Sequence, residues 1–245
     1  IAIDQEGGVV SRLPLPFVVT PSQLALGTHG DLPLAEEAAY FTGMQLRAHG
    51  VNTNFAPVLD VGNNPQNPIA GTRVFGSSPQ HVADFGLAAL RGYAASGVIA
   101  TIKHFPGHGD TTVDSHLGLP TAAHDRARLD AVELLPFRAA IAAGAPAIMT
   151  AHMVYSALDD APATLSPAIL RGLLRGELGF EGIIFSDALE MQAIADRYGA
   201  PRAGVLCKQA GGDVLLPLGD HANHVAVVEA LIAALESGVL DERCF

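Results

Sequence analysis

The feature that most constrains the fold of this chain is an alternation between short apolar runs and longer helix-like stretches. The apolar runs are Ile1–Ile3, Phe55–Leu59, Val98–Ile102, Ala147–Met149, Ile183–Phe185 and Val214–Leu216. The helix-like stretches are Leu34–His49, Gln80–Ser96, Arg126–Ala143, Pro167–Leu178, Met191–Gly211 and Ala222–Ser237. Short runs that are apolar throughout and separated by helices are typical of parallel strands buried on both faces. The sequence therefore predicts an α/β fold.

Six such units in succession, without the glycine fingerprint of a nucleotide-binding fold, favour a (β/α)8 TIM-type barrel over a doubly wound sheet. Glycines at the helix–strand junctions are expected to cap the helices; they are Gly50, Gly97, Gly144 and Gly182. The residues Ile1–Ile3 read as the interior of a strand and Val239–Phe245 as the opening of a helix. We therefore interpret residues 1–245 as a single catalytic barrel domain that lacks its first strand and is truncated at both ends.

The composition limits the class of partner. The chain has 14 basic and 25 acidic residues, a net charge of −11, and no basic run, so nucleic acid and anionic membrane are not expected partners. No apolar run reaches the roughly 18 residues that a membrane helix needs. The two cysteines, Cys207 and Cys244, have neither metal-ligand spacing nor the pattern of a disulfide framework, so a reducing compartment is the default expectation.

Polar side chains follow nearly every apolar run. They are Asp4, Asp60, Lys103 with His104, His152 and Asp187. In a parallel barrel the carboxyl ends of the strands form one rim, and active sites are built there. We therefore expect these side chains to converge on one binding site.

Two groups at this rim suit glycosyl transfer. Asp187 ends a buried run and would be held rigidly as a nucleophile, although an Asp here would equally suit a helix cap. Asp114 and His116 lie two apart in a loop rich in glycine, so the carboxylate can hydrogen-bond the imidazole and favour its protonated form. Such a pair can protonate a leaving oxygen and then deprotonate water. For an isolated pair of this spacing, a structural role is the commoner one.

The binding groups have simpler alternatives too. Asp4 could accept hydrogen bonds from two sugar hydroxyls or only cap a turn, and Arg12 and Arg73 could grip substrate oxygens or be solvated. Arg73 is the stronger candidate for substrate binding, because it lies in the Gly- and Asn-rich stretch Gly62–Gly76, which suggests a binding loop. A zinc site is a further reading, but Pro106 and Gly107 break any helical spacing between its ligands. Those ligands would be His104, His108, Asp114 and His116.

The same segments resemble glycoside hydrolase family 3, specifically its single-domain bacterial β-N-acetylglucosaminidases. The matching motifs are Asp4-Gln5-Glu6-Gly7-Gly8, Asn54-Phe55-Ala56-Pro57-Val58-Leu59-Asp60, Arg73-Val74-Phe75-Gly76, the loop Lys103–His116, and Ser186-Asp187-Ala188-Leu189-Glu190-Met191. They occur in the family's order and span essentially the whole chain.

The resemblance implies a retaining β-N-acetylhexosaminidase in which Asp187 forms the covalent glycosyl-enzyme and His116, assisted by Asp114, is the acid/base. It also implies that N-acetylglucosamine is bound by Asp4, Arg12, Arg73, Lys103 and His104, with Met191 lining the site. The expected substrates are cell-wall muropeptides, in peptidoglycan turnover and cell wall recycling in the cytoplasm. A secreted form is the alternative. We expect no cofactor and no resident metal.

Two positions depart from the family pattern. Ala188 follows the expected nucleophile where the family usually has a second acidic residue, and Val9 follows Gly8 where the family often has Arg. Two other functions stay open at this stage. One is a phosphorylase of the same fold that passes the sugar to phosphate, and the other is a non-catalytic sugar-binding relative.

Overall fold

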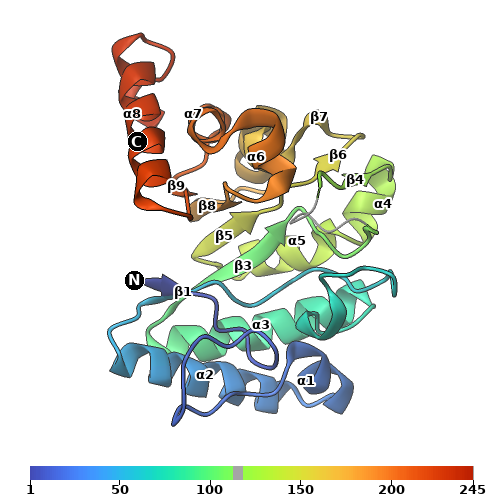
Figure 1. The fold of residues 1–245 in the computed structure, drawn as a ribbon. Helices are drawn as coiled ribbons and strands as arrows, with labels where there is room; N and C mark the ends of the chain where they lie inside the picture. Colours follow the sequence, from blue (N-terminus) through green and yellow to red (C-terminus); the bar gives the residue numbers. More distant parts are fainter. Residues whose placement is uncertain (113–117, 245) are drawn as a thin grey trace. The chain divides into compact units, whose positions relative to one another are not determined.

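The computed structural model describes residues 1–112 and 118–244, which fall into two compact units. Unit 1 comprises residues 1–110 and 127–149, and unit 2 comprises residues 111–126 and 150–245. Figure 1 follows the chain from the blue N-terminus to the red C-terminus. Unit 1 holds the strands of the first four predicted runs, and unit 2 holds those of the last two.

Unit 1 is built on parallel strands. Its strands lie side by side in the order β1 (Ala2–Ile3), β2 (Thr53–Asn54), β3 (Ile99–Phe105) and β5 (Ala147–Thr150). Ala2 lies opposite Thr53 in one parallel pair, and Thr53 lies opposite Ile99 in the next. Nearly all of β3 and all of β5 are buried, as expected for strands covered on both faces.

The strand predicted at Phe55–Leu59 is wrong in its position, because regular pairing is confined to Thr53–Asn54. Pro57 lies inside the predicted run and has no N–H to donate to a neighbouring strand. Pairing resumes only as an isolated parallel bridge between Val58 and Lys103.

The helices of unit 1 flank these strands. They are α1 (Gln23–His29), α2 (Leu32–Ala48), the 3-10 helix η1 (Gly71–Arg73), α3 (Pro79–Ser96), α4 (Arg126–Ala131) and α5 (Leu134–Ala142). Figure 1 shows α2 and α3 side by side. A Cβ atom on Gly92 would lie 2.2 Å from the carbonyl oxygen of Glu36, so a glycine is needed where these two helices meet. The single helix predicted at Arg126–Ala143 is two helices, broken at residues 132–133.

Three of the four predicted glycine caps have the left-handed backbone that this role requires. Gly50, Gly97 and Gly144 have φ values of 74°, 75° and 82°. The prediction for Gly182 is wrong, because the positive φ after that helix belongs to Gly179, at 66°.

Unit 2 contains a parallel pair and a small mixed sheet. In the pair, β8 (Ile183–Ala188) lies beside β9 (Val214–Leu216), with Phe185 opposite Val214. The small sheet comprises β4 (Thr121–Ala122), β6 (Val154–Tyr155) and β7 (Asp159–Pro162), with β4 parallel and β7 antiparallel to β6. These strands were not predicted, because they are too short to show a period-2 pattern.

The helices of unit 2 surround a separate core. They are the 3-10 helix η2 (Ala163–Leu165), the π-helix η3 (Ala168–Glu177), α6 (Gln192–Tyr198), α7 (Ala200–Ala210), α8 (His221–Glu236) and the 3-10 helix η4 (Glu242–Cys244). The helix predicted at Met191–Gly211 is two helices, because Gly199 has non-helical φ and ψ of 69° and 145°. Core residues from several of these elements pack together; they are Leu165, Leu189, Ile194, Ala200, Ala203, Cys207 and Val227.

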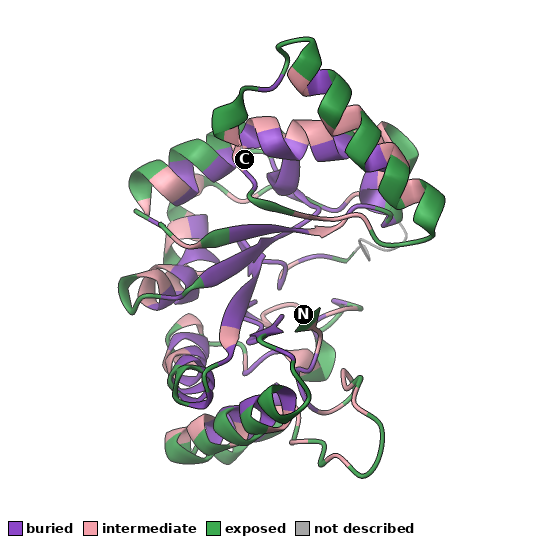
Figure 2. Ribbon diagram, turned by 90° about the vertical axis from the view of Figure 1, so that its left-hand side faces the viewer, coloured by how far each residue is buried: buried purple, intermediate pink, exposed green. Residues whose placement is uncertain are grey.

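Burial follows the predicted pattern. In Figure 2 the long strands are mainly purple, whereas the helices have a buried side and an exposed side. This is the distribution expected when helices cover buried parallel strands, and it confirms the predicted α/β class. Within residues 1–112 and 118–244, no helix combines the length and the apolar character needed to cross a membrane.

Candidate active site

The centre of the site in unit 1 is the ammonium group of Lys103 on β3. Its Nζ lies 2.6 Å from Asp4 Oδ1 and 2.7 Å from Glu6 Oε1. The Lys103 side chain is 2% exposed, whereas that of Asp4 is 39% exposed. Asp4 directly follows β1, and β1 and β3 are separated only by β2 in the parallel sheet. The shared direction of the strands therefore brings these distant residues together, with Asp4 on the accessible side.

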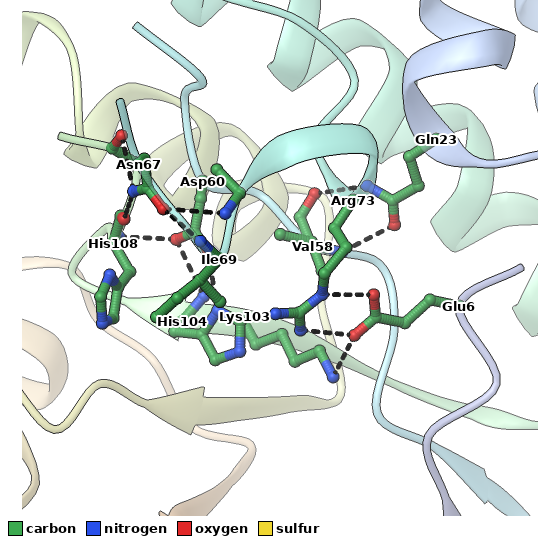
Figure 3. Close-up of polar contacts among 12 residues, drawn as sticks. Glu6, Gln23, Val58, Asp60, Asn67, Ile69, Arg73, Lys103, His104 and His108 are labelled. Atoms are coloured by element: carbon green, nitrogen blue, oxygen red, sulfur yellow. Dashed lines mark hydrogen bonds and ion pairs between the residues drawn. The ribbon is translucent and has the colours of Figure 1, made fainter. Parts of the chain in front are cut away.

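Arg73 joins the same group through Glu6. Its Nε and Nη2 donate hydrogen bonds of 2.8 and 2.7 Å to the two carboxylate oxygens of Glu6, a bidentate arrangement (Figure 3). Burial alone would raise the pKa of Glu6, but the opposite charges of Lys103 and Arg73 outweigh this effect and lower the pKa to about 2. Glu6 is therefore an anion that neutralises two cations at once. We refer to Asp4, Glu6, Arg73 and Lys103 as the ion-pair cluster.

The turn that carries Asp4 and Glu6 is fixed by amide side chains. The N–H of Gln5 donates to Asn54 Oδ1 at 3.0 Å, and Asn54 Nδ2 donates back to the Gln5 carbonyl oxygen at 2.8 Å. Gln5 Oε1 in turn accepts the backbone N–H of Arg12 at 2.7 Å. The Arg12 side chain itself is exposed and makes no hydrogen bond or ion pair in the described part of the chain. The structure therefore does not bring Arg12 into the ion-pair cluster.

Beside this cluster, the carboxylate of Asp60 organises the segment His104–His108. Asp60 Oδ2 lies 2.7 Å from His104 Nδ1, and Oδ1 accepts the backbone N–H groups of His104 at 3.1 Å and His108 at 2.7 Å (Figure 3). Burial alone would raise the pKa of Asp60, but the contacts with His104 and His108 outweigh this effect and lower the pKa to about 2. His104 is thus held by a charged carboxylate next to Lys103.

Asn67 provides a second anchor for this segment. Its Nδ2 donates to the carbonyl oxygens of His108 at 2.8 Å and Gly109 at 2.9 Å, while its Oδ1 accepts the N–H groups of Ile69 and Ala70, both at 2.8 Å. Gly109 lies so close to Val61 that an added Cβ would be 1.8 Å from the Val61 carbonyl oxygen. The loop that bears Arg73 and the loop that follows Lys103 are therefore joined by a single amide side chain.

Two of these residues, Glu6 and Asn67, were not predicted as site residues, and Asp60 was expected at the rim but was given no role. All three lie in motifs or stretches that the sequence singled out, and each is buried. A charged or amide residue within a glycine-rich or apolar motif is the signal that could have identified them, because such a group is buried only when it has partners.

Asp187 lies on β8 in unit 2. Its side chain is partly buried, and its Oδ1 accepts the N–H of Ala188 at 2.8 Å. The reading of Asp187 as a helix cap is not supported, because the residue that caps α6 is Met191. Met191 is buried in unit 2, and its N–H donates to the Ala188 carbonyl oxygen at 3.1 Å.

The end of β8 is held by a fully buried histidine. His152 Nε2 lies 2.8 Å from the carbonyl oxygen of Ala188, and His152 Nδ1 lies 2.8 Å from Thr164 Oγ1. A carbonyl oxygen can only accept, so Nε2 is the donor. Glu190 follows on the exposed side, and partial burial together with the charge of Asp187 raises its pKa. Two carboxylates of like charge therefore lie near each other at this strand end.

The predicted acid/base pair, Asp114 and His116, lies outside the described residues. The zinc reading depended on these two residues together with His104 and His108. Of the latter, His104 places its Nδ1 against Asp60.

A barrel-type α/β fold with charged groups at the ends of parallel strands is a general enzyme scaffold, and the comparison with known families makes it specific. The chain belongs to glycosyl hydrolase family 3, because residues 1–245 match the model of the family's N-terminal domain. The predicted family and the barrel fold class are thereby confirmed.

Named relatives agree with this assignment. A β-hexosaminidase A of Pseudoalteromonas piscicida is 42% identical, covering 88% of this chain and 39% of the relative. A β-hexosaminidase of Stenotrophomonas maltophilia is 40% identical, covering 98% of this chain and 74% of the relative. The solved structure of a family 3 β-N-acetylglucosaminidase from Paenibacillus sp. str. FPU-7 is 50% identical with a TM-score of 0.98, covering 99% of this chain and 47% of that one. The chain thus spans less than half of two of these relatives, and their names agree with the predicted enzyme class.

Proposed function

We propose that this protein is a retaining β-N-acetylglucosaminidase that hydrolyses terminal β-linked N-acetylglucosamine. The observation that carries the proposal is the ion-pair cluster, in which Asp4, Arg73 and Lys103 gather around buried Glu6. Half-exposed Asp4 offers carboxylate lone pairs to sugar hydroxyls, and Lys103 holds Asp4 in place through their ion pair. Lys103 and Arg73 are also the donors for sugar oxygens. Relatives named β-hexosaminidase, at about 40% identity, supply the sugar class.

In the proposed mechanism, a carboxylate oxygen of Asp187 attacks the anomeric carbon while His116 gives its proton to the leaving oxygen. The glycosidic bond breaks and a glycosyl-aspartate forms. His116, now neutral and assisted by Asp114, removes a proton from water, whose oxygen attacks the same carbon and releases Asp187. Inversion at each of the two steps gives net retention.

The remaining site residues have supporting roles in this proposal. By the resemblance to the family, His104, Arg12 and Met191 also contact the sugar. In unit 1, His104 follows Lys103 and is held by Asp60, whereas the Arg12 side chain is exposed outside the ion-pair cluster. We further propose that residues 1–245 belong to one catalytic barrel domain, that the natural substrates are cell-wall muropeptides, and that the protein acts in peptidoglycan turnover in the cytoplasm.

The decisive experiment is incubation with an aryl β-N-acetylglucosaminide and with a muropeptide, each with and without phosphate. Release of free N-acetylglucosamine at a rate independent of phosphate supports the hydrolase. Glycosyl phosphate as the main product would instead make the protein a phosphorylase, and binding without turnover would make it a sugar-binding relative. A fluorinated substrate should label Asp187, which mass analysis of the digested protein can locate.

A further inference from the structure

We infer that Asp60 is a positioning residue, which holds His104 so that its Nε2 atom accepts a hydrogen bond from a hydroxyl of the bound sugar. This inference rests on the proposed function for the identity of the ligand. It goes beyond that function because it assigns a role to Asp60 and a proton position to His104.

The proton position follows from the partners of Asp60. Its carboxylate can only accept hydrogen bonds, so the 2.7 Å contact with His104 Nδ1 requires that Nδ1 carry the proton. In the neutral ring the Nε2 atom then has a lone pair. The His104 side chain is 10% exposed, and in the described part of the chain Nε2 has no hydrogen-bond partner. Nε2 is therefore the atom left for a ligand, and in the neutral ring it is an acceptor.

The carboxylate is itself fixed on both sides. Its other oxygen accepts the backbone N–H groups of His104 and His108, at 3.1 and 2.7 Å. The side chain of Asp60 is only 5% exposed, so it cannot rotate without losing three hydrogen bonds in a buried site. His104 follows Lys103 in the chain, and Lys103 contacts Asp4 of the ion-pair cluster. The ring is therefore held in a fixed position next to the groups proposed to bind the sugar.

The change Asp60→Asn tests the role of the carboxylate with almost no change in shape. The two backbone N–H groups are donors, so the remaining oxygen must stay with them and the amide nitrogen must face His104 Nδ1. An amide nitrogen only donates, so the ring proton is expected to move to Nε2 and turn the acceptor into a donor.

The first measurement is ¹⁵N NMR of the histidine rings, which reports the tautomer without requiring turnover. In the unchanged protein the neutral ring of His104 should carry its proton on Nδ1, and in Asp60→Asn on Nε2. The matched control is Asp31→Asn, because Asp31 caps α2 on the surface of the same unit and should leave His104 unchanged. A proton on Nε2 in the unchanged protein would overturn the inference.

The second measurement is a double-mutant cycle on KM for the aryl glycoside. When His104 is intact, Asp60→Asn should raise KM about tenfold, the effect expected for one lost hydrogen bond to a substrate. It should have little further effect in the His104→Ala background, since Asp60 acts through that ring. Equal effects in both backgrounds would show a general structural role instead. If the unchanged protein had no turnover, the proposed function would fail while the NMR result would still decide the proton position.

Discussion

The charged groups of unit 1 and those at the end of β8 in unit 2 differ in burial and in the sign of the neighbouring charge. In unit 1, Glu6 and Lys103 are almost fully buried, and each lies within 2.7 Å of an opposite charge. In unit 2, Asp187 is only partly buried, and partial burial together with the like charge of Asp187 raises the pKa of Glu190. A carboxylate held in a bidentate ion pair is a poor nucleophile, because its lone pairs are already engaged. This difference is consistent with the proposed roles, in which the cluster of unit 1 holds the sugar and Asp187 attacks it.

Asp187→Ala should produce the largest effect and directly tests this separation. Turnover of an aryl β-N-acetylglucosaminide should fall by on the order of 10⁴-fold, because the covalent intermediate can no longer form. The free energy of unfolding should change by only about 0.5 kcal/mol, since the side chain is partly exposed. Glu190→Gln is the matched control in the same strand end and should retain most of the activity. Turnover that survives in Asp187→Ala would assign the nucleophile to another residue.

His116→Ala should give the next largest effect, and its size should depend on the substrate. For a leaving group that needs a proton, kcat should fall by about 10²–10⁴-fold, the usual contribution of general acid catalysis. For a nitrophenyl leaving group, which departs without a proton, the glycosylation step should be affected much less. The measurement is single-turnover kinetics on both substrates. An equal loss on both would rule out His116 as the acid.

Glu6→Gln tests whether the cluster in unit 1 depends on its buried anion. The change leaves Lys103 and Arg73 without their common counter-charge, and the free energy of unfolding should fall by about 3 kcal/mol. Chemical denaturation measures this directly. Glu36→Gln is the matched control, because the Glu36–Arg91 pair is also 2.8 Å long but exposed, and its loss should cost less than about 1 kcal/mol. Equal losses in the two variants would remove the contrast between buried and exposed pairs.

The smallest effect is the acid dependence that Glu6 adds to stability. Its pKa is about 2 in the folded protein against an ordinary value of 4.5. Because the folded-state pKa is lowered, the stabilisation is fully present above the ordinary value and is lost as the pH falls from there towards 2. Between about pH 6 and pH 3 the unchanged protein should therefore lose about 1–2 kcal/mol more than Glu6→Gln does. Urea unfolding of both proteins across this range checks the difference, and parallel curves would contradict it.

The sequence predicted the parts of the fold that rest on continuous apolar runs. Strands β3, β5, β8 and β9 appear where such runs occur, since parallel buried strands need apolar side chains on both faces. Helix α1 was missed because Gln23–His29 is short and contains Gly27 and Thr28, which are poor helix formers. The break at Gly199 was missed because a glycine inside an amphipathic pattern can be tolerated or can end the helix, and only packing decides.

The same reasoning explains what was found of the site. The proximity of Asp4 and Lys103 was predictable because both lie at or near the carboxyl ends of parallel strands that only β2 separates. Glu6 was not predicted as a site residue, and Asp60 was expected at the rim without a partner, because a sequence shows that a charge is present but not which group pairs with it. Their roles depend on side-chain directions that are set by the loops around Arg73 and His104.

The ion-pair cluster also bears on which sugars the protein can accept. Its two carboxylates and two cations cancel, so the subsite offers hydrogen bonds without a net electrical attraction. An uncharged N-acetylated ring suits such a surface, whereas a uronic acid or a sugar phosphate would gain nothing over its hydration in water. Under the proposed function, this charge balance disfavours acidic sugars without steric exclusion, and a substitution at Glu6 would change it.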